Sequence, residues 1–294
     1  MRVVVMLLIL CLTWVNAAAG WAAPPQVQLD VAQFRPDDRT VKGSVVELFT
    51  TISGQQLTYK QRGARLFQAA ATLTLEVVRP DGAAVYQETI TLKPPVLRDT
   101  SMALKNPLSF QKRLTVPPGT YTVRAQVRDQ YRAGSTGIAE QPLVVAVPTG
   151  KPQLSDVVLL SRPAARTAAE PTAFVRNGLS LVRAPGGLYA RGQEKLYFYA
   201  ELYDVPAGQG LAVRYRARAV GGTKDVLTGQ HLVQAASGQP TVLTGQLPLG
   251  ALAAGEYLLT LDIRNATNKV LTTRTVRFTR NPTEYAPTGA VAPR

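Results

Sequence analysis

The stretch PPGTYTVRAQVRD, residues 117–129, decides the fold class of this chain. Beyond its glycine, apolar residues alternate with polar ones, and the apolar series is Tyr121, Val123, Ala125 and Val127. A period of two predicts a β-strand with one buried and one solvated face. In immunoglobulin-like sandwiches, a tyrosine near the start of a late strand bonds back to the preceding corner. Tyr121 is therefore a candidate structural corner residue.

The same pattern returns in GEYLLTLDIRN, residues 255–265, where Tyr257 takes the place of Tyr121. Each copy is followed by one more strand-like segment, at 143–147 and at 273–278. Two copies, each closing a half of similar size, predict two related domains. A single larger β fold containing two unrelated hairpins stays open as the alternative.

Other segments have strand character as well. Residues 45–52 are rich in β-branched and aromatic side chains, and residues 71–92 form two strand-like runs around a Pro-Asp-Gly turn, as in a β-hairpin. LYFYAELY, residues 196–203, is apolar on both faces, which predicts a central strand. No long stretch shows helical spacing with caps. The sequence thus predicts an all-β protein with two tandem immunoglobulin-like β-sandwich domains.

The predicted organisation is a signal peptide at 1–23, a first sandwich at 24–148, a second sandwich at 152–280 and a disordered tail at 281–294. The boundary between the sandwiches rests on VPTGKP, residues 147–152, where two prolines and a glycine interrupt the strand pattern. The tail contains prolines and no strand pattern.

The N-terminus has the features of a secretory signal peptide. Arg2 precedes a short apolar run, and a cluster of small residues follows. The run is shorter than the ~20 residues that a membrane-spanning helix needs. An uncleaved membrane anchor and a lipoprotein modified at Cys11 are the alternatives. Cleavage would remove the only cysteine and both tryptophans. We therefore expect an exported protein, periplasmic, at the cell surface or secreted, without a disulfide.

A series of segments resembles a known bacterial family. The segments are VELFTTISGQQLTY, ATLTLEVVRPDG, PPGTYTVRAQVRD, LSDVVLL, FVRNGLSLVRAP and EKLYFYAELYDV. In this order and spacing they resemble the N-terminal β-sandwich region of exported proteins named for a Gly-Trp-x-Thr-Asp (GWxTD) motif, generally of unknown function. The resemblance covers residues 45–277. It implies a sandwich region without the motif-bearing domain, because no tryptophan follows Trp21. No functional residue transfers.

Residues for catalysis are sparse. The single histidine, His231, has no Gly-x-Ser-x-Gly elbow beside it, and with no second histidine or further cysteine a His-rich or Cys-rich zinc site is excluded. Asp37 with Asp38, and Glu201 with Asp204, are candidate carboxylate pairs for glycoside hydrolysis, but solvated loop and turn roles explain them more simply. We expect no enzyme activity, no cofactor and no metal.

Two features are candidate binding surfaces. Tyr197, Tyr199 and Tyr203 share a strand face and either stack on a sugar or, the preferred interpretation, serve the core. The second feature, an alternating arginine series, either pairs with carboxylates of the adjacent strand or contacts an anionic ligand or partner. Its members are Arg214, Arg216 and Arg218.

Charge and export together indicate the class of partner. The chain has 33 Lys and Arg against 19 Asp and Glu, a net charge of +14. Export argues against nucleic acid, and the short apolar run argues against an integral membrane protein after cleavage. We expect a non-catalytic exported binding or scaffolding protein of the bacterial cell envelope, whose partner is another envelope protein or an anionic envelope polymer. A glycan-binding module and a hydrolase with an unrecognised site are the alternatives.

Overall fold

The computed structural model describes residues 23–38, 40–101, 105, 107–166 and 175–285. Within these residues the chain consists of strands, loops and two short 3-10 turns, η1 (Gly54–Gln56) and η2 (Pro185–Gly187), with no α-helix. No helix in this part of the chain is therefore long and apolar enough to cross a bilayer. The predicted all-β fold class is confirmed. The predicted signal peptide, Cys11 included, lies outside the described residues.

The first sandwich is formed by β1 to β9. Its strands are β1 (Val27–Phe34), β2 (Ser44–Ile52), β3 (Lys60–Gly63), β4 (Leu66–Gln68), β5 (Ala71–Val78), β6 (Ala84–Leu92), β7 (Leu108–Val116), β8 (Gly119–Asp129) and β9 (Thr136–Val145). One sheet has the order β1-β2-β7, the other has the order β6-β5-β8-β9, and β3 pairs with β4 in a separate hairpin. The two sheets enclose apolar residues of β2, β5, β7 and β8.

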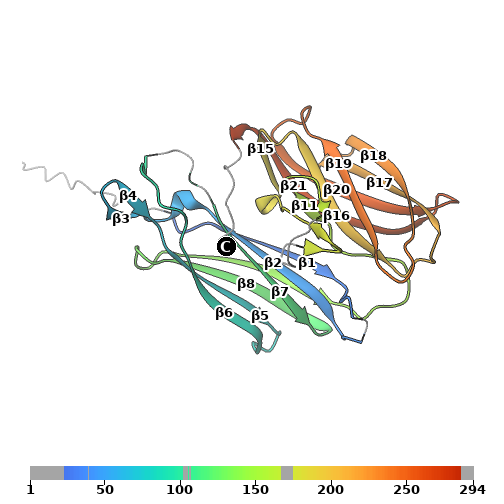
Figure 1. Ribbon diagram of the computed structural model, residues 1–294, viewed down its shortest axis with the longest axis horizontal. Coiled ribbons are helices and arrows are strands. Elements are labelled where there is room, and N and C mark those ends of the chain that lie inside the picture. The colour runs from blue at the N-terminus through green and yellow to red at the C-terminus, as the bar shows by residue number, and fades with distance from the viewer. Residues whose placement is uncertain (1–22, 39, 102–104, 106, 167–174, 286–294) are drawn as a thin grey trace, which may run out of the picture.

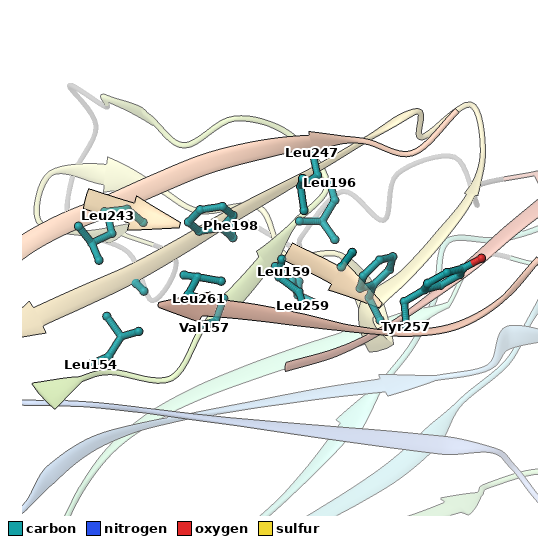
Figure 2. Close-up of a cluster of buried hydrophobic side chains, with 14 of the residues drawn as sticks. Leu154, Val157, Leu159, Leu196, Phe198, Leu243, Leu247, Tyr257, Leu259 and Leu261 are labelled. Atoms are coloured by element: carbon teal, nitrogen blue, oxygen red, sulfur yellow. The ribbon is translucent and has the colours of Figure 1, made fainter. Parts of the chain in front are cut away.

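The second sandwich is formed by β10 to β21. Its strands are β10 (Gln153–Leu154), β11 (Val158–Leu160), β12 (Ala165–Arg166), β13 (Val175–Arg176), β14 (Leu179–Ser180), β15 (Leu188–Arg191), β16 (Lys195–Tyr203), β17 (Gly210–Ala219), β18 (Asp225–Gln234), β19 (Thr241–Pro248), β20 (Gly255–Asn265) and β21 (Val270–Tyr285). In one sheet β16 pairs with β10, β11 and β19, and the other sheet has the order β15-β21-β20-β17-β18. Leucines of β16 and β19 face those of β20 in the core between these sheets (Figure 2).

The two sandwiches repeat one strand order. The order β1-β2-β7 of the first corresponds to β10/β11-β16-β19 of the second, and β6-β5-β8-β9 corresponds to β18-β17-β20-β21. None of the sheets formed by the described residues contains strands from both sides of residues 147–152. The chain is thus two tandem immunoglobulin-like sandwiches (Figure 1).

The two repeated tyrosines occupy equivalent corners. The hydroxyl of Tyr121 donates a hydrogen bond to the carbonyl of Pro117 at 3.0 Å, and that of Tyr257 donates to Ala253 at 3.0 Å. Both acceptors lie four residues upstream, so β8 and β20 enter their sheets through the same local geometry.

The end of the second sandwich differs from the sequence prediction. The disordered tail was predicted to begin at Asn281, but β21 continues to Tyr285, so the predicted start is wrong. Strand β15 pairs in parallel with this last part of β21, with Ala190 opposite Asn281. After Ser161, Ala165–Arg166 forms β12 at the edge of a small sheet of order β12-β14-β13. Residues 286–294 lie outside the described part of the chain.

Candidate functional site

The two sandwiches pack against each other through the outer faces of β1–β2 and β11–β16. Ala32 and Phe34 of β1 share one buried cluster with Val158, Leu160 and Tyr199 of the second sandwich. In Figure 1, β1 and β2 lie beside β11 and β16. Strands β2 and β16 are therefore buried on both faces, one turned to a sandwich core and the other to the interface. This agrees with the expectation of a central strand at 196–203.

Glu201 of β16 lies at the centre of the interface and has no exposed surface. Its Oε1 accepts hydrogen bonds from the Tyr199 hydroxyl at 2.7 Å and from Asn177 Nδ2 at 2.9 Å, and its Oε2 accepts one from the Tyr203 hydroxyl at 2.6 Å. Arg176 binds both oxygens, Oε1 from Nε at 2.7 Å and Oε2 from Nη2 at 3.2 Å. This bidentate arrangement is the strong form of the arginine–carboxylate pair.

Arg176 extends the network to Glu47 of the first sandwich. Its Nη1 lies 3.7 Å from Glu47 Oε1, and its guanidinium lies 4.0 Å from the centre of the Phe34 ring. Glu47 also accepts hydrogen bonds from Arg113 Nε at 3.1 Å and Nη2 at 2.7 Å. Arg113 Nη2 in turn donates to the carbonyl of Val175 across the interface at 3.0 Å. Two buried carboxylates and two arginines thus alternate across the junction.

The charges in this network are fixed by their surroundings. Burial acts to lower the pKa of the Arg176 guanidinium, but the hydrogen bond and charge of Glu201, with the charge of Glu47, outweigh it and raise that pKa. Burial, followed by the nearby charge of Glu201, raises the pKa of Tyr199 and of Tyr203 well above the usual tyrosine range. Arg176 is therefore a cation and both phenols are neutral donors at all physiological pH values.

The rim of the interface is polar as well. The backbone of Gln33 and Asp156 exchange hydrogen bonds, from Gln33 N to Asp156 Oδ2 at 2.9 Å and from Asp156 N to the Gln33 carbonyl at 3.2 Å. Arg35 donates to Asp204 Oδ2 at 2.5 Å and lies over the Tyr203 ring, 4.6 Å from its centre. Burial raises the pKa of the Asp156 carboxyl, although the charge of Arg274 acts in the opposite direction.

These contacts decide two of the sequence hypotheses. Tyr199 and Tyr203 are buried and bonded to Glu201, so they are unavailable as a sugar platform, and only Tyr197 is half-exposed. Glu201 and Asp204 do not act as a catalytic pair, because Glu201 is closed to solvent and Asp204 is bonded to Arg35.

The alternating arginines of β17 have carboxylate neighbours in their own sheet. Arg216 forms an ion pair with Asp262 of β20 and lies 3.9 Å from Asp225 of β18. Arg218 contacts the same Asp225 at 2.8 Å. The structure thus places Arg216 and Arg218 in the intramolecular arrangement, while Arg214 is exposed and forms no ion pair within the described residues.

His231 lies on the edge strand β18. Its ring packs 5.8 Å from the ring of Tyr215, and partial burial lowers its pKa below the usual value of 6.5. Among the described residues, no carboxylate hydrogen-bonds to it. No triad or carboxylate-assisted base is therefore formed at this position.

The described surface offers small hollows. One of about 210 Å³ lies beside Tyr197 and includes Pro163, Phe198 and Gln246 in its walls. Another of about 270 Å³ lies at the junction of the sandwiches, where Arg35 and Arg274 contribute to its lining. Both are smaller than the ~300–1,000 Å³ of typical ligand pockets.

Comparisons with known proteins give matches to solved structures at low sequence identity. No family model matches the sequence, and no curated protein matches it. Among solved structures, the dimeric latent PorU from Porphyromonas gingivalis is 13% identical with a TM-score of 0.31, and the match covers 90% of this chain and 21% of that one. Red sea bream transglutaminase is 12% identical with a TM-score of 0.26, over 87% of this chain and 31% of that one. The fibronectin(III)-like modules of Clostridium thermocellum CbhA are 12% identical with a TM-score of 0.24, over 90% and 100%. The chain thus spans about a third or less of the length of the first two.

Proposed function

We propose that this chain is a non-catalytic, exported binding or scaffolding protein of the bacterial cell envelope, in which the two sandwiches act as one rigid body. The observation that carries the proposal is the buried network of Glu47, Arg176 and Glu201 at the junction. A rigid pair of sandwiches presents sheet edges and loops at fixed positions, and these are the surfaces with which such folds recognise partners.

The arrangement of ionisable groups supports a role without catalysis. Glu201 has every acceptor position directed at a protein donor and has no access to a substrate. His231 lacks a carboxylate to orient it within the described residues. A general acid or base must reach the proton that it transfers, and the buried Glu201 has no such access.

Of the three tyrosines on which the glycan-binding alternative rests, Tyr197 alone keeps part of its surface exposed. Tyr197 lines the hollow of about 210 Å³, whereas Tyr199 and Tyr203 are buried. The partner that we propose is instead another envelope protein or an anionic envelope polymer or surface. The resemblance to the sandwich region of GWxTD-motif proteins is in keeping with an envelope role.

Rigidity is testable with single-molecule FRET across the junction. Dyes are placed at Thr89→Cys in β6 and Thr228→Cys in β18, both exposed positions, in a chain that begins at residue 24 and so lacks Cys11. We expect one narrow distribution of transfer efficiency. A broad distribution, or several populations, would refute the rigid-body proposal.

A further inference from the structure

One end of the first sandwich collects cations from three separate segments. They are the β3–β4 hairpin, the loop between β6 and β7, and the turn between β8 and β9. We call this surface the basic end; its cations are Lys60, Arg62, Arg65, Lys93, Arg98, Lys105 and Arg132. Figure 1 shows β3 and β4 at the end of the molecule away from β15 to β21.

Specific contacts hold the three segments together. Phe67 of the hairpin and Leu97 of the loop exchange backbone hydrogen bonds of 2.8 and 2.7 Å. The ring of Tyr131 in the turn contacts two cations of the hairpin: Lys60 Nζ lies 4.9 Å from the ring centre and the Arg62 guanidinium lies 5.2 Å from it. These contacts fix the three segments relative to one another, so the basic end is a defined surface of the fold.

The positive charge of the basic end is not compensated locally. The three segments contain one acidic residue, Asp99, and a second, Asp129, ends β8 next to the turn. Asp129 is buried and accepts hydrogen bonds from the backbone of Thr58 and Tyr131. Asp99 is exposed and is bonded to Ser101. Within the described part of the chain, none of the seven cations forms an ion pair with a carboxylate. This contrasts with Arg216 and Arg218 of β17, which are paired with carboxylates.

Exposed apolar side chains lie among these cations. Leu66 is 36% exposed next to Arg65, and Val96 is 48% exposed next to Leu97, the backbone partner of Phe67. A soluble polyanion would engage the charges and leave both apolar side chains in water. A bilayer with anionic headgroups attracts the charges and also offers apolar side chains a place below the headgroups.

We infer that the basic end docks this protein on a bilayer surface that carries anionic phospholipid headgroups. The inference rests on the proposed envelope role and names its partner surface. Lys60, Arg62 and Arg65 provide the electrostatic attraction, and Leu66 and Val96 enter the interfacial region.

The test is sedimentation with vesicles of phosphatidylglycerol and phosphatidylcholine, compared with vesicles of phosphatidylcholine alone. The K60Q/R62Q/R65Q variant should bind the anionic vesicles roughly 100-fold more weakly, since each basic residue near such a surface contributes about a factor of five. The matched control is R214Q/K224Q/K269Q, which removes three exposed cations from the second sandwich. Its net charge equals that of the K60Q/R62Q/R65Q variant. The affinity of the control variant for the anionic vesicles should decrease by less than threefold. Circular dichroism verifies that both variants are folded.

A second variant separates a lipid surface from a polymer. L66S/V96S should weaken vesicle binding about tenfold and leave retention on soluble polyphosphate unchanged. Equal losses in the two triple variants would overturn the assignment of the site, and unchanged vesicle binding by L66S/V96S would assign an anionic polymer instead. Absence of binding to anionic vesicles would overturn the inference while leaving the FRET test of the rigid body unaffected.

Discussion

Replacing Arg176 by methionine tests the buried network most directly. The side chain of Arg176 is 5% exposed and that of Glu201 is 0% exposed. At 2.7 Å the pair is in direct contact, and Glu201 retains only neutral donors when the guanidinium is removed. Charges about 4 Å apart attract by about 4 kcal/mol at an effective dielectric constant of ~20. Breaking a buried pair on one side costs about 3–5 kcal/mol. Methionine still covers the Phe34 ring, so most of the loss is electrostatic.

The expected result is therefore a decrease of about 3–5 kcal/mol in the free energy of unfolding of R176M. The double variant R176M/E201Q removes both charges and leaves Glu47 paired with Arg113, so its decrease should be only about 1–2 kcal/mol. The exposed pair Arg277–Glu256, with 59% and 53% of the side chains exposed, provides the control. R277M should change stability by less than about 0.5 kcal/mol.

Urea unfolding followed by circular dichroism and tyrosine fluorescence measures these differences. The reasoning is refuted if R176M lies within about 1 kcal/mol of the wild type. It is equally refuted if the double variant is less stable than R176M, because the cost would then not arise from an unpaired buried carboxylate.

Three further predictions concern single positions. The pKa of His231 is lowered in the folded state, so its contribution to stability is present above pH 6.5 and is lost as the pH falls through the folded pKa; unfolding curves of H231Q should lack this loss. Tyr121→Phe and Tyr257→Phe should each cost about 0.5–1.5 kcal/mol in urea unfolding, and the two costs should add, whereas coupled effects would mean that the corners are not independent. Gly245→Ala places a Cβ 2.4 Å from the ring of Phe198 and should cost about 1–3 kcal/mol; a thermal midpoint equal to that of the wild type would contradict this packing.

The sequence predicts those features that depend on local pattern. Alternation in residues 117–129 and 255–265 indicates strands with one buried face, and the structure has β8 and β20 there. The run LYFYAELY indicates a strand covered on both sides, which is β16. In each case the prediction rests on the spacing of neighbouring residues, because successive side chains of a strand point to opposite faces of the sheet.

The interface and the basic end depend on residues that only the tertiary fold brings together. Glu47 within an apolar stretch is, like Glu201 in LYFYAELY, a local signal of a buried charge, since a carboxylate there needs a partner. Its partner Arg176 lies in a strand of two residues with no pattern of its own. In β17, by contrast, the spacing of the arginines suggests a patch. Arg216 is neutralised by Asp262 of β20. This strand is adjacent to β17 in the sheet, but Asp262 is 46 residues from Arg216 in the sequence.

The position of the network in the repeated topology explains which surfaces remain for binding. Strands β2 and β16 occupy equivalent places in their sandwiches, and the interface covers the outer face of both. The loops at the distal end of the first sandwich and the edge strand β18, where Leu232 is 82% exposed, stay uncovered. A buried ion pair is weak evidence for stability, but it defines one orientation, because a shifted interface would leave Glu201 unpaired. R176M should therefore broaden the FRET distribution across the junction without weakening vesicle binding. If R176M changed both the FRET distribution and vesicle binding, the buried network and the basic end would not be independent. The proposal that the first sets the domain orientation and the second binds the membrane would then be wrong.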